Sequence, residues 1–236
     1  MFNERKLVMS KTQVIGDMSA WAGMMKDFWR QVSDGSITII MFAAFLQHKN
    51  PFAISDIRVE WQEFYRKYFR MSVDFSDVQI PDNSGGFDRA IFIPKGLKIN
   101  DVLKAIRKQF PTWSYEEDPD KDVIENIRQS DRNYAIRIRE RVEADEEFKD
   151  TSANSLRERG VNVITLLERL VFEVKYFSET SEHLDVSNVT LCAGSRGRVG
   201  GVPYVSWRAD HRGELRIDWC PPDVTSVRIR ARQAVS

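Results

Sequence analysis

The first periodic stretch of the chain repeats large apolar residues with helical spacing. Apolar positions from Trp21 to Val32 recur at three- and four-residue steps, the period of one helix face. An Asp-Gly-Ser break at 34–36 is followed by a second apolar run, which an Asn-Pro step at 50–51 ends. The pattern predicts a helical hairpin within residues 1–52. We expect its Met and aromatic stripe to form the hairpin core, because neither helix can bury its apolar face alone.

Residues 53–130 mix helical and strand patterns. Apolar spacing over 57–68 predicts a helix, and a short apolar run at 90–93 that stops before a proline predicts a strand. An asparagine that can cap a helix opens the amphipathic stretch 100–110, and residues 113–115 favour another strand. This order of elements is typical of a small α+β region.

Strand and helix patterns continue after residue 130. Residues 133–140 alternate as a strand does, and the acidic residues that follow, around 143–147, favour a polar helix. Thr165 and Glu168 match the T-x-x-E pattern of a capping box in front of a strong apolar stripe, which predicts a helix over 165–180.

The last segment, residues 191–236, has a period of two, which indicates short strands with one buried and one displayed face. The inward positions are expected to be Val205, Trp207, Leu215, Ile217, Trp219, Val227, Ile229 and Ala231. The outward neighbours are expected to be Tyr204, Ser206, Arg208, Glu214, Arg216, Asp218, Arg228, Arg230 and Arg232. Such Tyr, Ser, Arg and acidic side chains can stack, donate and accept, which suits recognition better than catalysis.

Charge and cysteine content narrow the possible functions. Lys+Arg 35 balances Asp+Glu 35, so the whole chain has no net field that would steer it to nucleic acid. Residues 191–236 are different, with eight arginines, no lysine and four acids. Arginine without lysine favours planar, bidentate or stacked contacts. The two cysteines, Cys192 and Cys220, cannot form a disulfide framework.

The patterns of common catalytic and metal sites are missing. No H-E-x-x-H, phosphate-binding loop or dinucleotide fingerprint occurs, and the three histidines are far apart in sequence. Acids at 118, 120 and 122 match the start of a calcium loop, but Val123 and Gln129 occupy the positions that need Gly and Glu. We therefore predict no catalytic residue, metal or cofactor.

Membrane and secretion signals are also absent from the sequence. The most apolar run, residues 37–46, is far short of the ~20 residues that a membrane helix needs. The first 30 residues lack the order of a signal peptide. We expect a soluble cytoplasmic protein without a membrane span, and its oligomeric state stays open.

Three short motifs of the C-terminal part resemble the C-type lectin fold in its formylglycine-generating-enzyme-like form. Residues 163–168, VITLLE, look like that family's L-P-T-E-A-E helix start without its proline. Residues 191–196, LCAGSR, are similar to its R-G-G-S-W strand, with Arg196 in place of the Trp. Residues 227–232, VRIRAR, look like its closing G-F-R strand. The resemblance implies a C-type-lectin-like ligand-binding domain at 131–236. Together with the helical hairpin at 1–52 and the small α+β region at 53–130, which the patterns above predict, this gives an α+β chain.

The same ending resembles the variable proteins of diversity-generating retroelements, which alter scattered codons in their last strands and loops. The resemblance implies a displayed, changeable set of ligand-binding residues: Arg198, Tyr204, Ser206, Arg208, Asp210, His211, Arg212, Arg216, Asp218 and Asp223. The paired cysteines of formylglycine-generating enzymes and the sugar-calcium motifs of lectins have no match here. Oxidase activity and calcium-dependent sugar binding are therefore not implied.

Three functions remain as hypotheses. The first is a non-enzymatic ligand-binding protein, whose partner is expected to be a protein surface, because Tyr and Arg carry much of the binding energy at interfaces. The second is a nucleic-acid-binding protein that uses the row Arg228, Arg230 and Arg232. The third is an enzyme that uses Cys192 or Cys220 as a thiol nucleophile.

Overall fold

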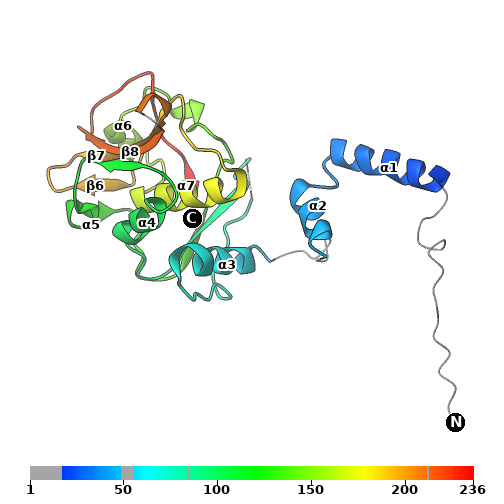
Figure 1. Ribbon diagram of the computed structural model, residues 1–236. Helices are drawn as coiled ribbons and strands as arrows, with labels where there is room; N and C mark the ends of the chain where they lie inside the picture. Colours follow the sequence, from blue (N-terminus) through cyan, green and yellow to red (C-terminus); the bar gives the residue numbers. More distant parts are fainter. Residues whose placement is uncertain (1–17, 49–55, 84, 212) are drawn as a thin grey trace, which may run out of the picture. The chain divides into compact units, whose positions relative to one another are not determined.

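The computed structural model describes residues 18–48, 56–83, 85–211 and 213–236, and it has the expected α+β composition (Figure 1). The chain divides into two compact units, Met1–Ser55 and Asp56–Ser236. The Asn-Pro step expected to end the second helix lies outside the described residues.

The first unit contains the expected pair of helices, α1 (Met18–Ser33) and α2 (Ile39–Leu46). A turn joins them, in which Gly35 has a φ of +79°, a conformation that glycine adopts without strain. The rings of Phe28 and Phe42 lie 5.3 Å apart and join the helices. The rest of the stripe is exposed within this unit, so the expectation that it forms a hairpin core was wrong. Two short helices offer each other too little surface to bury it.

The second unit is built on three sheets. The first has the order β1-β4-β10, formed by β1 (Arg89–Ile93), β4 (Tyr134–Ile138) and β10 (Ala234–Val235). The second has the order β2-β8-β7-β5-β9, formed by β2 (Thr112–Ser114), β8 (Glu214–Cys220), β7 (Val202–Arg208), β5 (Val189–Leu191) and β9 (Ile229–Arg230). The third pairs β3 (Val123–Asn126) with β6 (Ser195–Gly197).

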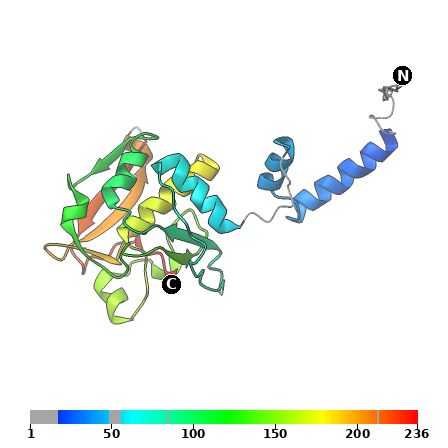
Figure 2. The same ribbon diagram turned by 90° about the horizontal axis from the view of Figure 1, so that it is seen from below.

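Helices fill the space around these sheets. They are α3 (Ile57–Phe69), α4 (Ile99–Ile106), α5 (Pro119–Asp122), α6 (Ala153–Glu158) and α7 (Leu166–Thr180), with 3₁₀ turns η2 (Glu146–Phe148) and η3 (Ala209–His211). Helix α7 contacts β1 of one sheet and β7 of another, with α4 beside it (Figure 1, Figure 2). It is therefore the central element of this unit.

The start of α7 confirms the expected capping box. Thr165 accepts a hydrogen bond from the Glu168 backbone N–H at 3.3 Å, and the Glu168 carboxylate accepts from the Thr165 N–H at 2.8 Å. The Gly194-Ser195 pair at the start of β6 contacts the same helix start, because Ser195 Oγ accepts from the Leu166 N–H at 2.9 Å. A Cβ at Gly194 would lie only 2.9 Å from the carbonyl oxygen of Ile164, so only glycine fits at this close approach.

The boundary expected at residue 130 does not separate two compact units. Strand β1 pairs with β4, β2 pairs with β8, and β3 pairs with β6, so each of these pairings crosses residue 130. Residues 56–236 accordingly form one unit with a shared main core. Sequence patterns did not reveal this, because partners far apart in sequence leave no local signal.

Two local expectations in this unit were wrong. Instead of a polar helix, the acidic segment forms only the 3₁₀ turn η2, because its carboxylates bind other parts of the chain. Glu143 accepts from the Ser187 and Asn188 N–H groups, both at 2.9 Å. The strand expected over 227–232 is limited to β9, and Val227, expected to face inward, is 65% exposed.

Candidate functional site

The long hairpin β7–β8 presents the displayed face that the sequence predicted. Its antiparallel register places Tyr204 opposite Asp218, Ser206 opposite Arg216, and Arg208 opposite Glu214. Paired residues of neighbouring strands lie on the same face of a sheet. The alternate residues, such as Val205 and Ile217, are buried in the main core. The hairpin therefore separates a fixed inner face from an outer face.

A shallow hollow of about 260 Å³ lies on this outer face. It is lined by Val189, Tyr204, Ser206, Arg208, Arg216, Cys220, Val224, Ser226, Arg228 and Ile229. Four of the predicted site residues are thus brought together. Ser206 is only 2% exposed, so it forms part of the floor and is not displayed as expected; its short side chain lies between the longer ones of its neighbours.

Acids beside the arginines of this face neutralise much of its positive charge. Arg208 Nη2 donates to Asp210 Oδ2 at 2.9 Å, and Arg216 Nη2 donates to Asp218 Oδ2 at 3.3 Å. Partial burial, reinforced by the negative charge of Asp218, raises the pKa of Tyr204. Its phenol therefore stays protonated at neutral pH, beside the Asp218 carboxylate.

An aromatic residue extends the same face at the edge of the sheet. The parallel pairing of β2 with β8 places Trp113 opposite Arg216, and the Arg216 guanidinium lies over the Trp113 ring at 4.1 Å. Tyr115 follows two residues later, is exposed, and its ring lies 6.3 Å from that of Trp113. Sequence reasoning missed both as site residues. A strand expected at 113–115 was the only signal, and nothing local identified its partner strand.

The remaining predicted site residues lie outside the hollow. Arg198 is exposed and donates to the Lys121 carbonyl at 3.0 Å. Asp210 is exposed in η3, and Asp223 is exposed in the loop before β9. Arg212 and the side chain of His211 lie outside the described residues.

The three arginines expected in one outward row have three different environments. Arg228 is exposed and lines the hollow. Arg230 is paired with Glu146. Arg232 is 1% exposed and donates to Asp185 at 2.7 Å, so its outward assignment was wrong. The β-ladder ends before Arg232, and the side chain turns inward to a buried carboxylate.

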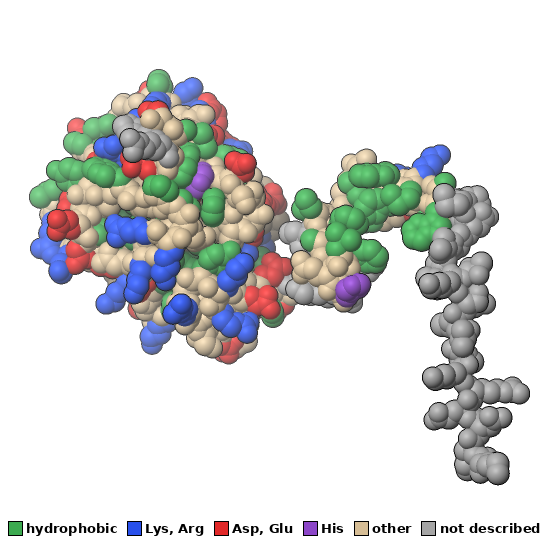
Figure 3. Space-filling view, in the orientation of Figure 1, with side chains coloured by type: hydrophobic (Ala, Val, Ile, Leu, Met, Phe, Trp, Pro, Cys, Tyr) green, Lys and Arg blue, Asp and Glu red, His purple; other side chains and the backbone are tan. Residues whose placement is uncertain are grey.

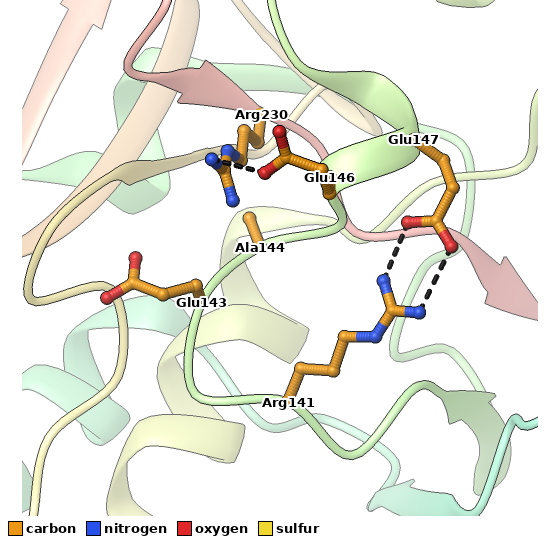
Figure 4. Close-up of a pocket in the computed structure, with 6 residues that line it drawn as sticks. All are labelled: Arg141, Glu143, Ala144, Glu146, Glu147 and Arg230. Carbon is orange, nitrogen blue, oxygen red and sulfur yellow. Dashed lines mark hydrogen bonds and ion pairs between the residues drawn. The ribbon is translucent and has the colours of Figure 1, made fainter.

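A second hollow, of about 580 Å³, lies beside η2 (Figure 4). It is lined by Arg141, Glu143, Ala144, Glu146, Glu147 and Arg230. Figure 4 shows a forked pair in which Arg141 donates to both Glu147 oxygens, at 2.6 and 3.0 Å. Hydrogen bonding from Arg141 lowers the pKa of Glu147 to about 2. Glu146 and Glu147 already have cationic partners and Glu143 accepts backbone N–H groups, so the hollow is poorly suited to bind a metal ion.

The acidic loop considered for calcium has a structural role. Asp120 accepts the backbone N–H groups of Ile99 and Asn100 at 2.8 and 3.0 Å, at the start of α4. A carboxylate at a helix N-terminus satisfies free N–H groups and the helix dipole. Across the described ranges, no group of three or more His, Cys, Asp and Glu residues is arranged to hold a metal ion.

The two cysteines have environments that disfavour the thiolate. Burial raises the pKa of Cys192 far above its ordinary value, and it raises the pKa of Cys220 to about 11. Both thiols are therefore protonated at neutral pH. The thiolate is the nucleophilic form of cysteine, so neither side chain is activated for covalent chemistry.

Comparison with known proteins gave no match: no family model, no curated protein and no solved structure is similar to this chain. Among the described residues, no helix is both long enough and apolar enough to cross a membrane.

Proposed function

We propose that this protein is a non-enzymatic ligand-binding protein that binds a protein target on the outer face of β7 and β8. The observation that carries the proposal is the alternation along this hairpin between residues of the main core and residues that line the hollow. Tyr204, Arg208 and Arg216 line a common outer hollow, whereas Val205 and Ile217 are buried behind them. Outer side chains such as Arg208 and Arg216 can change here without disturbing the main core.

The chemistry of the face favours a protein over a small molecule. Its hollow of about 260 Å³ is shallow and smaller than the roughly 300–1,000 Å³ typical of small-molecule pockets. Trp, Tyr and Arg are the residues that contribute most to protein interfaces, and Trp113, Tyr204 and Arg216 present all three. A rigid sheet holds them at little entropic cost. The raised pKa values of both cysteines support a role without covalent catalysis.

The proposal includes a diversifiable surface, like that of the variable proteins of diversity-generating retroelements. Two of the three motifs that resemble the C-type lectin fold contact each other. The capped start of α7 and the Gly194-Ser195 pair are joined by the Ser195 to Leu166 hydrogen bond. This contact would support a C-type-lectin-like arrangement, in which a fixed frame carries changeable strands.

The alternative, nucleic-acid binding through the arginines of the last strands, has weaker support. Arg232 is buried and Arg230 is paired with Glu146, which leaves Arg228 as the exposed member of the row. Arg208 and Arg216 also have acidic partners. Binding to a random oligonucleotide that weakens steeply with added salt would favour this alternative.

The test of the proposed function is the pattern of natural variation. The coding region of residues 191–236 would be sequenced from many closely related genomes. We expect substitutions to concentrate at 204, 208, 216 and 218, while Val205, Leu215 and Ile217 stay fixed. Uniform variation, or none, would contradict a diversified surface.

A laboratory test asks whether the outer face is free to change. We expect the double variant Arg208→Ala, Arg216→Ala to keep the melting temperature nearly unchanged, because both side chains are partly exposed and their ion pairs with acids of the same face contribute little to stability. The matched control Val205→Ala should lower it by several degrees, because Val205 is fully buried. A collapse of folding in the double variant would refute the division into outer and inner faces.

A further inference from the structure

Helix α2 is apolar on every side. Its eight residues, IIMFAAFL, include no polar or charged side chain. A helix without a polar face is stable only when other structure surrounds it, and eight residues are far too few to span a membrane. Helix α1 contacts one side of it through Phe28 and Phe42. The other sides of α2 therefore need further apolar partners.

Helix α1 adds a second apolar surface to the same unit. The described residues of the two helices include nine large apolar side chains that are at least one-third exposed: Trp21, Met24, Met25, Trp29, Val32, Ile39, Phe42, Phe45 and Leu46. Figure 3 shows apolar side chains over much of the visible face of these helices. We call this surface the hairpin patch. A patch this large is typical of an interaction site and not of an ordinary exposed surface.

The charges of α1 argue against an anionic partner. Arg30 donates to Asp27 at 2.8 Å and to Asp34 at 3.1 Å, so its charge is compensated within the hairpin. Helices that lie on membranes are rich in Lys and Arg on their polar face. This hairpin is not, and its patch fits a neutral, apolar protein surface.

The second unit offers no matching surface among its described residues. Its exposed large apolar residues are Val59, Tyr115, Ile124, Ile127, Val142, Val186, Val199 and Val227. They are spread over α3, β3 and several loops, mostly as single side chains. Scattered exposed apolar residues are ordinary on protein surfaces. The described surface that best matches the hairpin patch is the hairpin patch itself.

We propose that the hairpin patch pairs with the same patch of a second copy of this chain, forming a four-helix bundle that holds a homodimer together. An aromatic side chain buries on the order of 150–250 Å² and the smaller apolar ones somewhat less, so nine half-exposed side chains, four of them aromatic, offer roughly 800 Å² per copy. A stable interface buries about 800 Å² per partner, so the patch is large enough. The dimer would carry two outer faces of β7 and β8.

Sedimentation of the full-length chain over a wide concentration range tests the proposal. We expect a species of twice the 27.4 kDa chain mass. The double variant Trp29→Asp, Phe45→Asp should raise the dissociation constant by about 100-fold or more, because central aromatic residues dominate interface energies. The matched control Val199→Asp places the same charge at a fully exposed apolar site outside the patch and should remain a dimer.

The outcomes separate the possible occupants of the patch. A monomer at every concentration overturns the proposal, and so does a dimer that the double variant retains. If the chain is a monomer and co-floats with neutral phosphatidylcholine vesicles in a density gradient, the hairpin patch binds a membrane and the proposal is overturned. If the double variant aggregates, cross-linking of the variant Met24→Cys tests the dimer instead. This variant should form disulfide-linked dimers under mild oxidation, whereas Val199→Cys should not, and equal cross-linking of the two overturns the proposal.

Discussion

At the scale of single residues, Asp185 is a fully buried charged residue that depends on its ion-pair partners. Its carboxylate is fully buried between two arginines: Arg169 Nε donates at 2.9 Å and Arg232 Nη2 at 2.7 Å. Arg169 also donates to buried Glu173 at 2.8 Å. Arg232 further donates to the carbonyl of Val142 at 2.7 Å, so this network fixes the C-terminal segment to the rest of the unit.

The network predicts how stability depends on pH. Burial alone would raise the pKa of Asp185, but Arg232 and Arg169 outweigh it and hold the pKa below its ordinary value. The stabilisation is therefore fully present above the unfolded pKa, about 3.9, and is lost as pH falls through the lower folded pKa. We expect Asp185→Asn to lower the free energy of unfolding by about 3–5 kcal/mol at pH 7, because it leaves the buried Arg232 without its charge partner and Arg169 with Glu173 alone.

The difference in the free energy of unfolding between the wild type and Asp185→Asn should stay constant from about pH 7 to pH 5. It should narrow below about pH 4, because only the wild type has a carboxylate here that loses its charge on protonation. Urea titrations at each pH measure it. The exposed Asp223→Asn serves as a control and should change stability by less than about 0.5 kcal/mol. A difference that does not depend on pH would show that the Asp185 charge is not the source of the stabilisation.

At the scale of elements, α7 depends on its N-terminal cap. The Thr165 side chain is the acceptor for the Glu168 N–H, and Glu168 is also bound by Arg128 at 2.7 Å. We expect Thr165→Ala to lower the free energy of unfolding by about 1 kcal/mol, the usual effect of losing such a cap. Thr165→Ser keeps the acceptor oxygen and should lose much less. Denaturant unfolding of both variants measures the difference, and equal losses would mean that packing of the methyl group matters more than the cap.

The elements that were predicted correctly from the sequence have in common that the residues indicating each element lie within that element. Helices α3 and α7, predicted over 57–68 and 165–180, could be recognised because apolar spacing and a capping box are local features. The acidic helix and the strand at 227–232 were wrong because contacts with distant residues decide those conformations. Arg232, for example, turns inward to a carboxylate 47 residues earlier in the chain.

The residues of the candidate site likewise fall into those that local sequence patterns predict and those that depend on distant partners. Tyr204, Arg208 and Arg216 could be predicted from alternation, because a period of two assigns faces without knowledge of the partner strand. Trp113 could not, because its place beside Arg216 depends on a parallel pairing across about a hundred residues. The burial of Ser206 in the floor of the hollow could not be predicted, because it depends on longer side chains of the adjacent strands.

At the scale of the whole molecule, residues 56–236 should unfold as one cooperative body. Leu103 of α4 and Ile217 of β8 come from opposite sides of residue 130, yet both are 1% exposed and belong to the same core. Because the sheets also join strands across that residue, neither part can lose its structure without exposing the core of the other. Cooperativity here follows from the topology.

Native-state hydrogen exchange tests this cooperativity, because it measures the protection of backbone amides in α4 and in β8 separately from that of the helices in the first unit. We expect Leu103→Ala and Ile217→Ala each to cost about 2–5 kcal/mol, and each to lower the protection of the most stable amides in α4 and in β8 by the same amount. If residues 53–130 were an independent domain, Leu103→Ala would speed exchange in α4 alone. Equal loss in both elements would instead mean that the outer face of β7 and β8 owes its rigidity to helices encoded a hundred residues earlier.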